Sequence, residues 1–174
     1  MKNKTLNICT LALFSSFALT SCGFQPMYGK HVQTASRQDT NIQNQLAEID
    51  IANIPDAEGV YLRNALMDRF YRTQRPQNPR YTLTVGKIRE SIVDLDITKT
   101  SDATRAQLRL NTEMTLTDNQ SGEAVLTRSL GTVTSYNILT SEFATRVSED
   151  NTRKNALDDL ARQIELQTGL YLRR

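Results

Sequence analysis

Four stretches of the chain alternate apolar and polar residues with a period of two, which predicts β-strands. The first two cover residues 46–54 and 81–93, and we expect a bulge near Gly86 in the second. The polar run 94–104 that follows is predicted to be a connection or an extended edge. The clearest strand has one side made of residues at every second position: Leu108, Leu110, Thr112, Met114 and Leu116.

A polar turn at residues 118–122 separates that strand from a second long one, residues 125–138. Because the turn is short, the two strands are predicted to pair as an antiparallel hairpin. The inward side of the second strand is expected to consist of Leu126, Leu130, Thr132, Thr134 and Tyr136.

Two other stretches carry apolar residues at helical spacing. In residues 58–72 the apolar stripe is Leu62, Leu66 and Phe70, and Asp56 is expected to cap the helix. The second helix is predicted from Glu142 to about Thr168, with Ser141 as N-cap and Gly169 at its end. Three acid-before-base pairs at spacing four are expected to support its solvent side: Glu149–Arg153, Asp150–Lys154 and Asp158–Arg162.

The elements follow in the order strand, helix, strand, strand, strand, helix. This order predicts an α+β fold, a two-layer sandwich with two helices packed on one face of a four-stranded, mostly antiparallel sheet. Residues 45–174 are expected to form this single domain.

The N-terminus has the layout of a secretory signal peptide. Lys2 and Lys4 precede a mostly apolar core, residues 6–19, which is shorter than the roughly 20 residues of a membrane-spanning helix. The core ends in Leu19-Thr20-Ser21-Cys22, which resembles the lipobox of bacterial lipoproteins. We therefore expect residues 1–21 to be cleaved as a signal peptide and Cys22 to carry the lipid anchor.

Residues 22–44 are predicted to be the lipidated anchor and a flexible tether, because residues 30–44 are rich in Gln, Thr, Ser and Asn. Gly23 follows the anchor cysteine where an Asp would favour retention in the inner membrane of enteric bacteria. The sequence thus predicts a chain that is lipid-anchored in the outer membrane, on its periplasmic side.

Composition argues against several function classes. Without Lys2 and Lys4 the 21 basic residues fall to 19, equal to the 19 acidic ones, so charge gives no support for nucleic-acid binding. Outside the signal, Cys22 and His31 are the only cysteine and histidine, which leaves no disulfide, zinc site or catalytic triad. We expect no enzyme, no metal and no cofactor.

One charge run stands out in this otherwise balanced chain. Between Arg63 and Arg89, seven cations are opposed by Asp68 alone. Arginine suits phosphate groups, so a phosphorylated glycolipid at a membrane is one interpretation, and a solvated helix face and loop is the other. The candidate ligand-binding residues are Arg69, Arg72, Arg75, Arg80, Lys87 and Arg89.

Threonines are frequent on the strands. The outer faces could pair with another protein, through an edge strand in particular, or the threonines could simply be good strand formers on a wet face. The residues concerned are Thr82, Thr84, Thr112, Thr115, Thr117, Thr127, Thr132 and Thr134.

Several short motifs resemble those of LPS-assembly lipoproteins of the LptE family. The segment Cys22-Gly23-Phe24-Gln25-Pro26-Met27-Tyr28-Gly29 resembles the start of their mature chains. Three weaker matches follow in order: Leu62-Arg63-Asn64, Ser135-Tyr136-Asn137, and Ser141 with Phe143-Ala144. The resemblance extends over the whole mature chain and agrees with the α+β order predicted above.

The resemblance implies a function without catalysis. LptE proteins sit inside the LptD β-barrel of the outer membrane, assist its assembly, plug it, and bind lipopolysaccharide on its way to the outer leaflet. Partners implied for this chain are an LptD-type barrel and lipopolysaccharide. The alternative is a structural adaptor lipoprotein of another envelope complex, without a lipid ligand.

Overall fold

The computed structural model describes residues 36–71, 74–97 and 103–173. The predicted signal peptide, the anchor residue Cys22, His31 and Arg72 lie outside these ranges. Among the described helices, none combines the length and the apolarity needed to span a membrane.

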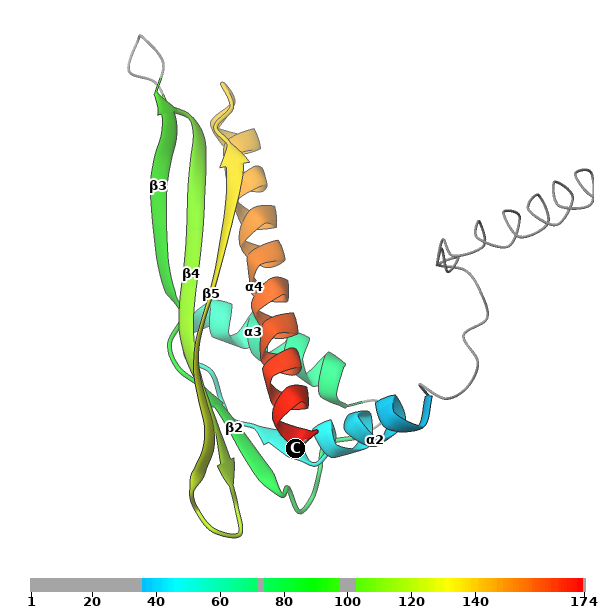
Figure 1. Ribbon diagram of the computed structural model, residues 1–174. Helices are drawn as coiled ribbons and strands as arrows, with labels where there is room; N and C mark the ends of the chain where they lie inside the picture. Colours follow the sequence, from blue (N-terminus) through cyan, green and yellow to red (C-terminus); the bar gives the residue numbers. More distant parts are fainter. Residues whose placement is uncertain (1–35, 72–73, 98–102, 174) are drawn as a thin grey trace, which may run out of the picture. The chain divides into compact units, whose positions relative to one another are not determined.

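Strand β4 (Ala103–Asp118) organises the sheet, because β2, β3 and β5 all pair with it in antiparallel fashion. β5 (Ala124–Asn137) runs along one side of β4, while β2 (Tyr81–Val85) and β3 (Arg89–Ile97) follow each other along the other side (Figure 1). β1 (Ile49–Ile51) lies parallel to β2. The sheet thus has four columns, and β2 and β3 together form the second one.

The predicted alternation of β4 and β5 is confirmed. On β4 the even-numbered residues from Ala106 to Leu116 are buried. They lie opposite the predicted inward residues of β5, with Leu116 opposite Leu126 and Ala106 opposite Tyr136. The hairpin turn contains Gly122 at a φ of 73°, a left-handed conformation that glycine adopts without strain.

The second strand bends where the sequence places Gly86. The Gly86 N–H donates to the Glu113 carbonyl over 2.8 Å, and the Thr112 hydroxyl donates to the Gly86 carbonyl over 2.9 Å. After this interruption β3 pairs with β4 in a shifted register and continues to Ile97. The run after residue 93 therefore begins as an extended edge.

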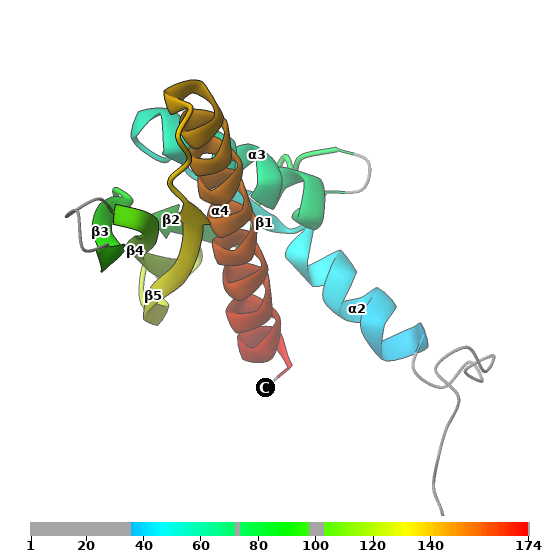
Figure 2. The ribbon, with the colours of Figure 1, turned by 90° about the horizontal axis from the view of Figure 1, so that it is seen from above.

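Helices α3 (Asp56–Phe70) and α4 (Glu142–Leu172) cover one face of the sheet, which confirms the two-layer α+β fold (Figure 2). The predicted stripe of α3 is buried, as are Leu157, Leu160 and Ile164 of α4. Burying such a side chain fully contributes about 1.5–3 kcal/mol, so this layer contact is the main stabilising term.

A third helix, α2 (Ser36–Leu46), occupies residues that the sequence analysis assigned largely to a tether. Its polarity concealed it, because only Ile42 and Leu46 are strongly apolar in that stretch. Leu46 is buried in the core, and Ile42 packs against it while facing α4 at Gly169. Tertiary contact with α4 therefore supplies the stability that helix propensity alone does not provide.

Two helix ends differ from the predictions. α3 begins directly after Pro55, has no side-chain capping hydrogen bond, and holds Asp56 at a φ of 66°. Asp56 instead pairs with Lys87 at 3.1 Å. α4 passes through Gly169 and continues to Leu172, whereas its predicted start is confirmed, since the Ser141 hydroxyl accepts from the Ala144 N–H.

The charged pairs of α4 do more than support a solvent face. Arg153 pairs with Glu149 as predicted, and its guanidinium also binds both carboxylate oxygens of Glu90 on β3 at 2.9 Å. The Glu90 carboxylate is the main cause of a raised Arg153 pKa. Asp150 pairs with Arg153 rather than with Lys154. This fork–fork contact fixes α4 to the second column of the sheet.

The adjacent Asp158 and Asp159 face different neighbours, in line with consecutive positions on a helix. Asp158 lies 3.4 Å from the Tyr61 hydroxyl of α3, while Asp159 accepts from Thr132 of β5 at 3.0 Å. Arg162 bonds to Asp159 instead of the predicted Asp158, and this is the largest cause of the lowered Asp159 pKa. The two carboxylates thus tie α4 to both layers.

Two helical glycines make a matched test of the packing. A Cβ at Gly59 would lie 2.7 Å from the Ile54 carbonyl oxygen, whereas a Cβ at Gly169 would lie 3.6 Å from the Ile42 γ-methyl. Gly59→Ala should lower the free energy of unfolding by about 1–3 kcal/mol through overpacking. Gly169→Ala should raise it by about 0.5–1 kcal/mol through helix propensity. Urea unfolding measures both, and a loss of stability in Gly169→Ala would contradict a continuous α4.

A second prediction concerns the Arg153 contact. Arg153→Met leaves the Glu90 and Glu149 carboxylates without their partner and should lower the free energy of unfolding by about 1–3 kcal/mol. Arg146→Met is the matched control, because Arg146 is 74% exposed against 20% for Arg153, and its pair with Glu142 is worth under about 0.5 kcal/mol. Equal unfolding midpoints in urea for the two variants would refute the role of Arg153.

Candidate functional site

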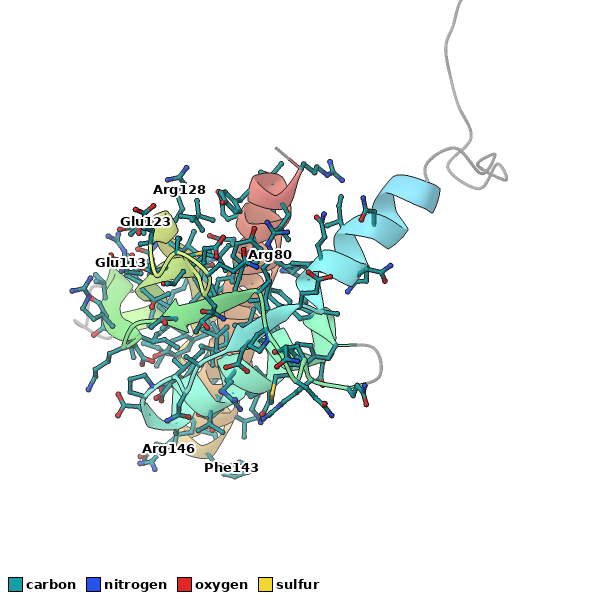
Figure 3. All side chains as sticks on the ribbon, turned by 90° about the horizontal axis from the view of Figure 1, so that it is seen from below. Arg80, Glu113, Glu123, Arg128, Phe143 and Arg146 are labelled. Atoms are coloured by element: carbon teal, nitrogen blue, oxygen red, sulfur yellow. The ribbon has the colours of Figure 1, made fainter. Side chains whose placement is uncertain are left out.

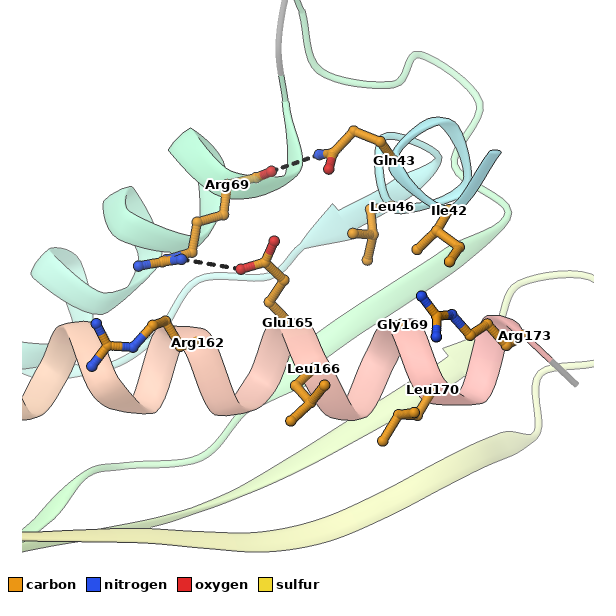
Figure 4. Close-up of a pocket in the computed structure, with 10 residues that line it drawn as sticks. All are labelled: Ile42, Gln43, Leu46, Arg69, Arg162, Glu165, Leu166, Gly169, Leu170 and Arg173. Atoms are coloured by element: carbon orange, nitrogen blue, oxygen red, sulfur yellow. Dashed lines mark hydrogen bonds and ion pairs between the residues drawn. The ribbon is translucent and has the colours of Figure 1, made fainter. Parts of the chain in front are cut away.

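A groove with an apolar floor runs between α2 and the C-terminal half of α4, and we call it the α2–α4 groove. Its cavity volume is about 450 Å³. Ile42 and Leu46 line it from α2, and Leu166 and Leu170 line it from α4 (Figure 4). Leu166 is 59% exposed and Leu170 is 48% exposed, so the α4 side of the groove presents two apolar side chains to solvent.

Charged groups border this groove. Arg69 of α3 pairs with Glu165 of α4 at 3.1 Å, and the Gln43 amide donates to the Arg69 carbonyl at 2.8 Å. Arg162 and Arg173 add two further guanidinium groups to its lining (Figure 4). An apolar floor with cations beside it can accept an aliphatic chain that carries an anionic group.

The face of the sheet opposite the helices is polar and uncovered by any described element. Odd-numbered residues of β4 lie on it, with their partners in the neighbouring strands. Of the eight threonines considered above, five lie on this face: Thr82, Thr84, Thr115, Thr117 and Thr127. The other three lie on the helix side. Thr112 is an even-numbered residue of β4, and Thr132 and Thr134 of β5 pair with even-numbered residues of β4. We call the uncovered side the open face.

The predicted cationic residues contact different neighbours. Arg69 is held by Glu165, and Lys87 by Asp56. Arg75 contacts the Met67 sulfur, and the Arg80 guanidinium lies 5.2 Å from the centre of the Tyr81 ring. Arg89 lies on the open face opposite Asn111. Of these five, Arg75, Arg80 and Arg89 are exposed and form no ion pair with a carboxylate of the described residues.

Arg63, at the start of the same run, has a structural role. Its guanidinium donates to the Ile51 and Ala52 carbonyls at 3.0–3.2 Å and so joins α3 to the end of β1. Three of the seven cations in the run, Arg63, Arg69 and Lys87, thus bond to other elements of the fold, and Arg72 lies outside the described residues.

A second apolar surface lies where α4 begins. Phe143 is 78% exposed, and Val147 and Leu139 beside it in the chain are also exposed. Phe143 and Arg146 lie at one end of the molecule, while Arg80, Glu123 and Arg128 lie toward the other (Figure 3). The groove is lined by α4 residues from Arg162 onward, near the other end of this long helix, so the patch is separate from the α2–α4 groove.

The described residues contain no group of three or more His, Cys, Asp or Glu side chains that could hold a metal ion. The groove was not predicted, because Leu166 and Leu170 lie outside the buried side of α4 and because α2 was not expected. Their spacing of four residues was the available signal. Phe143 entered only as part of a family motif.

Comparisons with solved structures support the fold. A lipoprotein from Caulobacter crescentus CB15 matches with a TM-score of 0.59 at 18% identity, over 76% of this chain and 95% of that one. A minor lipoprotein from Acinetobacter baumannii matches with a TM-score of 0.54 at 22% identity, over 71% and 92%. Rare lipoprotein B from Shewanella oneidensis matches with 0.54 at 12% identity, over 72% and 97%.

Among curated protein sequences, none matches the chain. A family model does match: that of LptE, described as lipopolysaccharide-assembly, over residues 46–168. The match spans the elements from the end of α2 to most of α4, and so includes the whole sheet. The chain belongs to the LptE family of lipopolysaccharide-assembly proteins.

Proposed function

We propose that this protein is an outer-membrane lipoprotein that assembles with an LptD-type β-barrel, plugs it, and assists the insertion of lipopolysaccharide into the outer leaflet. The observation that carries the proposal is the LptE family match over residues 46–168. In this proposal Cys22 carries the lipid anchor and the folded domain stands on the periplasmic side of the membrane.

The open face supports a place inside a barrel. A porin-type barrel presents polar side chains to its lumen, so a plug must meet polar walls. Threonine, arginine and asparagine side chains of β2 to β5 supply such a surface, and water can bridge the remaining distances. A helix-covered sheet with one dry and one polar face suits this role.

Lipopolysaccharide combines phosphate groups with acyl chains, and the chain offers groups for both. Exposed cations can bind phosphate, and the α2–α4 groove can accept an acyl chain. We propose as phosphate ligands the six cations predicted from the sequence, Arg69, Arg72, Arg75, Arg80, Lys87 and Arg89. Arg75 and Arg80 are exposed and suit a test.

The rival function is that of an adaptor lipoprotein in another envelope complex, without a lipid ligand. It shares the anchor, the fold and the absence of predicted catalytic residues, so the identity of the partner separates the two functions.

The barrel partner can be tested by purification from detergent-solubilised outer membranes, with mass spectrometry of the bound proteins. We expect a large β-barrel in stoichiometric amount. Phe143→Asp should reduce its recovery at least tenfold if the apolar patch at the start of α4 is part of the contact. Val60→Asp is the matched control, because Val60 is an exposed apolar residue of α3, at 54% exposure. Recovery with periplasmic partners alone would favour the adaptor.

Lipopolysaccharide binding can be tested with charge reversals. The triple variant Arg72→Glu, Arg75→Glu and Arg80→Glu should bind lipopolysaccharide at least tenfold more weakly at low salt. The difference should be smaller at high salt, because salt screens the electrostatic attraction. Arg146→Glu, far from Arg80 (Figure 3), is the control for charge alone. Fluorescence anisotropy with labelled lipopolysaccharide measures both. Binding that is unchanged in the triple variant would refute the proposed phosphate ligands.

A further inference from the structure

The outer edge of β3 is a long strand edge without a partner in the described structure. β1 fills the first column of the sheet beside β2, but its three residues end there, and no described strand occupies the same column beside β3. β3 is seen at the margin of the sheet in two perpendicular views (Figures 1 and 2). The first column therefore has no described strand beside β3.

The hydrogen-bonding pattern shows which main-chain groups face this gap. The Ile138 N–H donates to the Thr104 carbonyl and the Gly86 N–H to the Glu113 carbonyl. Even-numbered residues of β4 thus bond toward β5 and odd-numbered ones toward β2 and β3. Since odd-numbered β3 residues lie opposite odd-numbered β4 residues, the N–H and C=O groups of Glu90, Ile92 and Asp94 point outward.

Stable proteins usually shorten or cover the edges of their sheets, and the other two edges of this sheet show this in part. β1 is only three residues long. At the β5 edge, the outward carbonyl of Gly131 accepts from the Gln163 side chain of α4 at 3.3 Å. No described side chain donates a hydrogen bond of this kind to the outward groups of β3. This strand exposes apolar side chains on both of its faces, with Ile92 at 42% on the helix side and Val93 at 43% on the open face.

Charge identifies the kind of strand that fits. Glu90 and Asp94 lie on the helix side of β3, where Arg153 neutralises Glu90 and no ion pair involves Asp94 among the described residues. The Asp94 carboxylate lies near Tyr136, whose pKa is raised by burial first and then by Glu149 and Asp94. An incoming strand therefore meets the negative charge of the Asp94 carboxylate, which no described residue neutralises in an ion pair.

A second copy of this chain fits the edge poorly in antiparallel pairing. Pairing through the outward groups would place Glu90, Ile92 and Asp94 opposite residues of the same set. Registers that set Asp94 opposite Asp94 or Glu90 bring acidic residues together, which is unfavourable. A basic segment of another protein avoids this repulsion.

We propose that β3 accepts an extended segment of another protein as an additional sheet strand, with Lys or Arg beside Asp94 and β-branched residues beside Ile92 and Val93. Main-chain hydrogen bonds to Glu90, Ile92 and Asp94 provide the affinity, and the basic side chain provides the selectivity. The inference rests on the geometry of β3 and is independent of the proposed function.

The test uses the full chain and a synthetic peptide, Thr-Lys-Thr-Val-Val-Lys-Thr, with amide hydrogen exchange followed by NMR. At saturation the peptide should slow exchange at Ile92 and Asp94 at least tenfold. The Val93 amide should change little, because it already donates to β4. A peptide with Glu in place of Lys should bind at least tenfold more weakly. Protection elsewhere, or none, would overturn the proposal.

Three controls separate strand pairing from charge attraction. One control peptide is N-methylated at both lysines and at the first valine, whose amides would face β3. It should give no protection of the β3 amides from exchange, and equal protection would exclude main-chain pairing. Ile92→Pro removes an outward N–H but no bond to β4, so it should keep the fold by circular dichroism and lose the peptide. Asp94→Lys should reverse the preference toward the Glu peptide, and an unchanged preference would refute the role of Asp94.

Discussion

The burial of one side of β4 is the constraint on which the rest of the structure depends. Its even-numbered residues from Ala106 to Leu116 are almost fully buried, and a strand with a period of two can bury only one side under a single helical layer. The helices must therefore lie on that side, and the main-chain groups of the strand must find partners on both flanks. β5 satisfies one flank, and β2 with β3 the other.

This arrangement also leaves surfaces without cover. One layer of helices protects one face, so the opposite face of the sheet stays polar and open. The second column is long, but β1 pairs only with Tyr81–Leu83 of β2, so the edge of β3 has no partner strand in the described structure. α4 is long enough to follow the β4–β5 hairpin, and its two ends carry exposed apolar residues, Phe143 at one and Leu166 with Leu170 toward the other. These are the surfaces that an assembly component can use.

The similar solved structures share less than 25% identity with the chain, so their agreement concerns the fold. The support for a function comes from the family match, which covers residues 46–168. The fold requires stripes of apolar positions, and many different sequences meet this requirement. The architecture can therefore persist where individual side chains differ. Binding residues are less constrained by packing and have to be tested directly.

The sequence by itself determined the α+β class, the β4–β5 hairpin, the bend at Gly86 and the cap at Ser141, because each depends on periodicity or turn chemistry within a few residues. Tertiary structure alone decided the rest. α2 exists because Ile42 and Leu46 find apolar neighbours, α4 continues through Gly169, and Arg153 reaches across 63 positions of sequence to Glu90. The cations between Arg63 and Arg89 are neighbours in the chain but contact different elements, since the chain reverses direction between them. Such contacts depend on where remote segments meet, which local patterns do not encode.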